Sequence, residues 1–126
     1  MPNTVCPCGS QKLFNACCGR FLEQEQFAKT PEQLMRSRFT AFFMGGYGQY
    51  LEDTWAAEMR GGLRAVDLNQ RETEWLRLEI IKKNQKGDSG EVEFKAYFKD
   101  GNAEGCHHEH SCFERRDGRW LYISAK

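Results

Sequence analysis

The sequence predicts an α+β protein in which helices precede an antiparallel sheet and a small cysteine-rich segment precedes both. Apolar residues recur at helical spacing over residues 30–55, alternate with polar ones after residue 75, and four of the six cysteines lie before residue 19. Helices followed by a run of strands are typical of segregated α+β domains. A chain of 126 residues that is 40% hydrophobic can build one core.

The first feature along the chain is a cluster of four cysteines. Cys6 and Cys8 straddle one residue, and Cys17 and Cys18 are adjacent. A structural Zn²⁺ takes four thiolates in a tetrahedron, and a turn at Gly9-Ser10 would bring the two pairs together. The spacing therefore predicts one structural zinc ion bound by all four, with no open coordination position for catalysis.

A disulfide framework or a redox site is the alternative use of these cysteines. Residues 1–20 show no secretory leader, and no apolar run reaches the roughly 18 residues of a membrane span. We therefore expect a cytoplasmic chain with reduced thiols. A vicinal Cys17–Cys18 disulfide would be strained, because adjacent Cα atoms are ~3.8 Å apart and disulfides prefer ~5.5 Å. The Cys-x-x-Cys of redox proteins is absent.

A polar run at 23–26 predicts the boundary between a knuckle over 1–22 and a main domain over 27–126. The main domain opens with a helix that has Thr30 as N-cap, Pro31 at its first position and Gln33 completing a capping box. Gly45-Gly46 predicts its end. A second helix is expected over 47–55, followed by a short helix and loops over 59–72.

The long helix carries one apolar stripe, and the strands that follow each carry one apolar face. Met35, Phe39, Phe42 and Phe43 recur at helical spacing and are expected in the core rather than in a cofactor groove. The strands show alternation at positions 76, 78 and 80 and again at 92, 94, 96 and 98. Turn signals at 87–90, 100–102 and 117–118 separate four strands.

The strand over 104–115 is the one that holds candidate pocket residues. By parity, one face carries Cys106, His108, His110 and Cys112, and the other carries His107, Glu109, Ser111 and Phe113. Phe113 indicates which face points inward. Glu109 and Ser111 would then form a possible pocket with Arg36 of the helix, although a structural Arg36–Glu109 pair is favoured over a ligand contact.

His108 and His110 on the other face form a His-x-His pair. Two histidines alone make a weak metal site, so we favour plain surface exposure. Cys106 and Cys112 lie about 20 Å apart along an extended strand, too far to share one ion. These two cysteines are expected to be ordinary reduced thiols.

The sequence also resembles a known bacterial family. Cys-Pro-Cys-Gly-Ser at 6–10, followed by Cys-Cys-Gly at 17–19, is similar to the SEC-C motif of the SecA translocation ATPase. The segments 34–42, 54–55, 74–76 and 108–113 resemble the YchJ family. This resemblance implies a SEC-C knuckle before a cystatin-like, or nuclear transport factor 2-like, domain in which helices pack on a curved antiparallel sheet.

Three classes of function compete. The favoured one is a non-enzymatic zinc adaptor that binds a protein partner through the knuckle, as the resemblance to the SecA tail that engages the SecB chaperone implies. The alternative is small-molecule binding or catalysis in a pocket between the helices and the curved sheet, called the cone pocket. Nucleic-acid or ribosome binding through Lys12, Arg20, Arg36 and Arg38 is the third, and we do not favour it, because the chain has 18 basic and 18 acidic residues.

Overall fold

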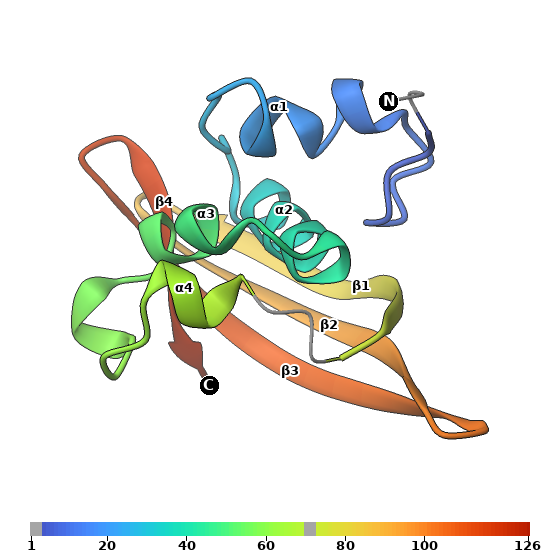
Figure 1. Cartoon of the computed structure of the whole chain (residues 1–126). Helices are drawn as coiled ribbons and strands as arrows, with labels where there is room; N and C mark the ends of the chain where they lie inside the picture. Colours follow the sequence, from blue (N-terminus) through green and yellow to red (C-terminus); the bar gives the residue numbers. More distant parts are fainter. Residues whose placement is uncertain (1–3, 70–72) are drawn as a thin grey trace.

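The structure, a computed structural model, describes residues 4–69 and 73–126. A four-stranded antiparallel sheet in the order β1-β2-β3-β4 curves beneath a layer of helices (Figure 1). The N-terminal segment packs on α2, and its turn at Gly9 also lies next to the Leu78 carbonyl of β1. The elements are η1 (Phe14–Ala16), α1 (Gly19–Leu22), α2 (Pro31–Met44), α3 (Gly48–Asp53), η2 (Ala57–Met59), α4 (Ala65–Leu68), β1 (Trp75–Lys86), β2 (Ser89–Asp100), β3 (Ala103–Arg116) and β4 (Arg119–Ala125). The predicted α+β architecture is confirmed.

Helix α2 lies between the N-terminal cysteine segment and the sheet, and its boundaries match the prediction. The Thr30 side chain accepts a hydrogen bond from the Gln33 N–H at 3.1 Å, and Gly45 ends the helix with a φ of 74°. The Gln33 side chain accepts from the Lys29 N–H and not from that of Thr30, so the predicted capping box is only half formed. A well-capped helix of 14 residues gives both neighbouring regions a rigid support.

The three hairpins of the sheet are tight, as the turn signals predicted. Only two residues separate β1 from β2, β2 from β3 and β3 from β4, and each of these turns contains a glycine with positive φ. The apolar alternation of β2 is confirmed, because Val92, Phe94 and Ala96 are buried. Leu76 is exposed, contrary to the expected pattern, because a register shift between Trp75 and Arg77 gives the core-facing position to Trp75.

The core lies between α2 and the concave face of the sheet. Its buried members include Leu34 and Phe39 from α2, Phe94 from β2, Phe113 from β3 and Trp120 from β4. The Trp120 indole N–H donates to the Lys29 carbonyl at 3.2 Å, which anchors β4 to the start of α2. Every strand of the sheet and helix α2 therefore contribute side chains to one core.

Part of the predicted apolar stripe of α2 does not lie in this core. Phe39 is buried, whereas Met35 and Phe42 are only partly buried and line a cavity between the helix and the sheet. The expectation of core packing is thus correct for Phe39 and wrong for Phe42. Phe42 lines the cavity without belonging to the core cluster, whereas Met35 and Phe43 pack against the buried core.

The remaining segments are short. The stretch predicted as a short helix and loops over 59–72 contains α4, and its residues 70–72 lie outside the described part of the chain. Among the helices that the structure describes, none has the length and apolar character that crossing a bilayer requires.

Candidate metal centre and cone cavity

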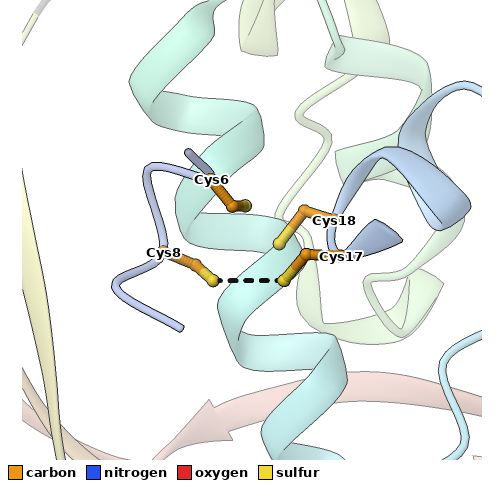
Figure 2. A group of neighbouring side chains, drawn as sticks. All are labelled: Cys6, Cys8, Cys17 and Cys18. Carbon is orange, nitrogen blue, oxygen red and sulfur yellow. Dashed lines mark hydrogen bonds between the residues drawn. The ribbon is translucent and has the colours of Figure 1, made fainter. Parts of the chain in front are cut away.

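The four predicted cysteine ligands converge on one point. Their side chains point toward one another from two separate segments, and the four Sγ atoms all lie within 4.8 Å of one another (Figure 2). The Cys8 and Cys17 sulfurs are 3.6 Å apart. Tetrahedral coordination at 2.3 Å places sulfurs about 3.8 Å apart, so this arrangement fits a metal ion bound by four thiolates.

Local structure explains why the four sulfurs meet. Cys6 and Cys8 lie on a small hairpin in which the Cys6 N–H donates to the Lys12 carbonyl at 2.8 Å. Gly9 turns the chain with a φ of 85°, a conformation that glycine adopts without strain. Cys17 and Cys18 lie between η1 and α1, and Phe14 of η1 is buried in one cluster with the four cysteines.

The chemistry of the cluster favours a cation. Hydrogen bonds from Cys18, then from Cys6 and Ser10, lower the pKa of the Cys8 thiol. Hydrogen bonds with Cys6 and Cys8, together with burial, raise the pKa of the Cys18 thiol. The negative charge of the Cys8 thiolate therefore makes ionisation of the neighbouring thiols less favourable. A divalent cation would offset this charge repulsion by binding all four cysteines as thiolates.

Hydroxyl groups next to the sulfurs come from two parts of the chain, the turn after Cys8 and helix α2. The Ser10 Oγ lies 3.1 Å from the Cys17 Sγ, and the buried Thr40 of α2 donates from Oγ1 to the Cys18 Sγ at 3.4 Å. The same Thr40 oxygen is 3.8 Å from the Cys6 Sγ. Sequence reasoning missed Thr40, because nothing in the motif indicates which face of α2 the knuckle covers.

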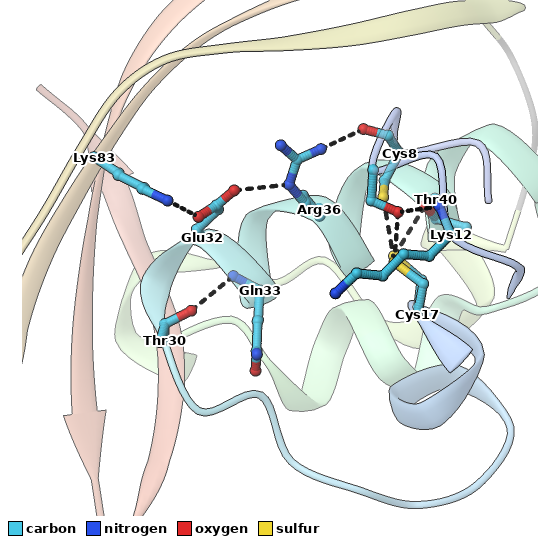
Figure 3. Close-up of polar contacts among 11 residues, drawn as sticks. Cys8, Lys12, Cys17, Thr30, Glu32, Gln33, Arg36, Thr40 and Lys83 are labelled. Carbon is cyan, nitrogen blue, oxygen red and sulfur yellow. Dashed lines mark hydrogen bonds and ion pairs between the residues drawn. The ribbon is translucent and has the colours of Figure 1, made fainter. Parts of the chain in front are cut away.

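Arg36 also belongs to this centre. Its Nη1 donates to the Cys8 carbonyl at 2.7 Å, and its Nε donates to Glu32, which in turn pairs with Lys83 of β1 (Figure 3). Arg36 and Thr40 are one helical turn apart on the same face of α2. This face of the helix therefore holds the metal centre against the sheet domain.

The predicted Arg36–Glu109 pair is thus wrong. Glu109 and Ser111 lie on the concave face of β3 as parity predicted, and both line the cone cavity. Arg36 points to the knuckle, and the helix arginine that lines the cavity is Arg38. Residues 36 and 38 of a helix differ by about 200° in direction, so they serve opposite faces.

Among the described residues, the outer face of β3 shows no further metal site. His108 pairs with Glu93 at 2.7 Å, and His110 pairs with Glu91 on the neighbouring strand. Within residues 4–69 and 73–126, the four N-terminal cysteines are the only group placed to share a metal ion. Cys106 is exposed and Cys112 is partly buried, and both are free thiols.

Known proteins share both parts of this structure. Residues 30–125 match the family described as "YchJ, middle NTF2-like domain", and residues 3–20 match the SEC-C motif. A UPF0225 protein of Corynebacterium glutamicum is 41% identical over 120 residues, covering 93% of this chain and 92% of its own. A UPF0225 protein of Streptomyces coelicolor is 38% identical over 129 residues, covering 100% and 98%.

Two solved structures have the same fold. The solution structure of a SEC-C motif containing protein from Rhodopseudomonas palustris superposes with a TM-score of 0.87 at 34% identity, covering 98% of both chains. The crystal structure of a SEC-C motif containing protein from Psychrobacter arcticus gives 0.80 at 26% identity, covering 96% of this chain and 81% of the other. With both its segments matched, the chain belongs to the YchJ-like family of bacterial proteins, in which a SEC-C motif precedes an NTF2-like domain.

Proposed function

We propose that this protein is a non-enzymatic zinc adaptor, in which one structural Zn²⁺ fixes the knuckle as a protein-binding surface. The observation that carries the proposal is the contrast within the knuckle between buried and exposed side chains. The four cysteines are buried, whereas Val5 and Leu13 are 61% and 47% exposed. The ion would hold the four cysteines together in the interior of the knuckle, and the side chains of Val5 and Leu13 would be exposed to a partner.

Zinc is the metal that suits this centre. Four thiolates from cysteine form a soft donor set, and their spacing suits a tetrahedral ion. Four protein ligands also complete the coordination shell, so no position is left for the water that a catalytic zinc ion needs. A structural role follows, and we place the protein in the cytoplasm, where such thiols stay reduced.

The exposed pair is fixed by the same backbone that carries two of the ligands. Val5 and Leu13 face each other across an isolated antiparallel bridge, and the Phe14 N–H donates to the Thr4 carbonyl at 2.7 Å. Val5 directly precedes the ligand Cys6. Loss of the ion would therefore disorder the apolar pair, which makes partner binding dependent on zinc.

Two of the basic residues considered for nucleic-acid binding do not support that role. Arg38 is 4% exposed, and Arg36 is engaged with Glu32 and the knuckle backbone. Backbone phosphates need cations that reach the surface. The adaptor proposal is therefore preferred over nucleic-acid or ribosome binding.

The zinc proposal is tested by metal analysis of purified protein. We expect one zinc ion per chain in wild type and in Cys106→Ser, which changes an exposed free thiol on β3. Cys8→Ser should lose most of the metal, because three thiolates leave an incomplete shell. Less than half an equivalent in wild type, or full zinc in Cys8→Ser, would contradict the proposal.

The adaptor proposal is tested with a photo-crosslinking amino acid at position 5 and, as a control, at position 66. Val66 is 68% exposed on α4, away from the knuckle, and so reports non-specific contacts. In bacterial lysate we expect a discrete product from position 5 that is lost on chelation and in Leu13→Asp. Identical products from both positions would show that the knuckle is not a selective surface.

A further inference from the structure

The cavity between α2 and the sheet is not used by the adaptor role. It has a volume of about 590 Å³, within the range of small-molecule sites. Its walls are mostly aromatic and apolar, with contributions from α2 and from strands β1 and β2. These apolar walls are formed by Met35, Phe39, Phe42, Trp75, Phe94 and Phe98.

One end of the cavity is polar and centres on Glu109. The Glu109 Oε2 accepts hydrogen bonds from Ser111 and, at 3.0 Å, from Tyr122, while Oε1 lies 3.0 Å from the His107 Nε2. Burial alone would raise the pKa of Glu109, but the hydrogen bonds from Ser111, His107 and Tyr122 outweigh it and lower that pKa. The carboxyl group is therefore an anion at neutral pH.

Glu109 keeps capacity for a ligand. A carboxylate offers about four lone-pair positions, and three neighbours occupy three of them. The fourth belongs to Oε1, which only His107 contacts among the described residues. The Glu109 side chain is 18% exposed and lines the cavity, so the carboxylate is not sealed off from it. An N–H donor from a ligand can occupy this fourth position.

Arg38 lies beside this end of the cavity but is poorly placed to bind an anion. Its Nη1 already donates to the Leu51 carbonyl at 2.9 Å and to the Thr54 Oγ1 at 2.7 Å. Its guanidinium carbon lies 5.4 Å from the centre of the Trp55 ring and 5.1 Å from that of Tyr122, so rings cover it. Arg38 is therefore a buried neighbour of Glu109, and the Glu109 carboxylate is the group at this end that keeps an acceptor position. His107, Lys99 and Glu74 also line the cavity.

We propose that the cone cavity binds a small organic amine, a molecule with a flat apolar body and a protonated nitrogen that donates to Glu109. The apolar walls would take the body, and the carboxylate would take the charge. Aromatic faces around the site also favour a cation over an anion. This inference does not rest on the adaptor role, because it concerns the opposite face of α2.

The same residues would also fit a purely structural role, in which Glu109 links β3 to β4 through Tyr122. The two roles differ in what a change of charge does. In a structural network, loss of the charge affects stability alone. In a binding site, it affects the affinity for amines more than the affinity for neutral molecules of the same shape.

The experiment uses three probes that share one ring system: 1-naphthylmethylamine, 1-naphthalenemethanol and the carboxylate 1-naphthaleneacetate. Binding is followed by isothermal titration calorimetry. We expect saturable binding of the amine, with the alcohol about tenfold weaker and the acid weaker still, since a charged hydrogen bond is worth that much. Equal binding of the three, preference for the acid, or no binding of the amine would overturn the proposal.

Two variants and one control locate the site. Glu109→Gln should weaken amine binding about tenfold and leave the alcohol unchanged, whereas Glu91→Gln, on the outer face of β2, should change neither. Ala96→Leu fills the cavity floor and should weaken both probes. Full amine affinity in Glu109→Gln or in Ala96→Leu would show that the amine binds elsewhere and would refute the proposal.

Discussion

The two faces of α2 support regions that are stabilised in different ways. On one face, Arg36 and Thr40 contact a knuckle whose interior consists of four cysteines and Phe14. On the other, Phe39 packs into a core shared by the sheet, and Arg38 is buried behind the cone cavity. The knuckle has helices of only three and four residues, and we propose that a metal ion stabilises it, whereas the cone domain is stabilised by packing.

Removal of the metal is expected to give the largest effect and to separate the two regions. Apparent zinc binding energies of ~10–16 kcal/mol in small zinc domains show how far such a segment depends on its ion. Chelation should therefore remove hydrogen-exchange protection from residues 4–22 while β2 and β3 keep theirs. If β2 and β3 lose protection as well, the knuckle and the cone domain form a single cooperative unit.

The two arginines of α2 should differ in their contribution to stability. Arg38→Ala leaves the Leu51 carbonyl and the Thr54 hydroxyl without a buried donor, so we expect a loss of about 3 kcal/mol in the free energy of unfolding. Arg36→Ala removes a side chain that is 22% exposed and should cost about 1 kcal/mol. Urea unfolding of both variants measures the difference, and equal losses would contradict the division of the helix into two faces.

The sequence predicted the parts of the molecule that depend on local spacing. The cysteine ligands follow from a short motif, the inward position of Glu109 and Ser111 follows from the two-residue period of a strand, and the hairpins follow from glycine turns. Thr30 and Gly45 likewise mark the ends of α2 through local capping chemistry.

Features that depend on how elements dock were not predictable in the same way. Arg36 and Arg38 both flank the apolar stripe of α2, and only the position of the knuckle decides which of them meets the metal centre. Leu76 was placed on the buried face because the register shift beside Trp75 leaves no sequence signal. The cavity beside Phe42 depends on how α2 and the sheet pack against each other, which apolar periodicity does not encode.

Thr40 should contribute to metal affinity without being a ligand. Thr40→Val keeps the shape of the side chain but removes the hydroxyl that donates to the Cys18 Sγ, and outer-shell partners of this kind change metal affinity by about tenfold or more. Competition with a chromophoric chelator measures the zinc affinity. Ser37→Ala is the matched control, because Ser37 is fully buried on α2 and bonds to Leu34 and Tyr50 instead. Unchanged zinc affinity in Thr40→Val, or an equal loss in Ser37→Ala, would refute this role.

The smallest expected effect is a pH dependence on the cavity side of α2. Because the pKa of Glu109 is lower in the folded protein than the ~4.3 of an unfolded chain, the ionised group stabilises the fold at neutral pH. This contribution is fully present above the unfolded value and is lost as the pH falls through the folded value. Glu109→Gln lacks it at every pH.

The stability difference between wild type and Glu109→Gln should therefore shrink as the pH is lowered from 7 toward 3, which thermal melts of the two proteins at each pH can measure. Acid also protonates other carboxylates and competes for the metal-binding thiolates, but both proteins share these effects and the difference cancels them. Asp100→Asn, which removes an exposed carboxylate at the end of β2, serves as a control for the loss of one negative charge. A difference that stays constant or grows with acid would mean that Glu109 is not held as an anion by Ser111, His107 and Tyr122, and the cavity would then lack the charge on which amine binding depends.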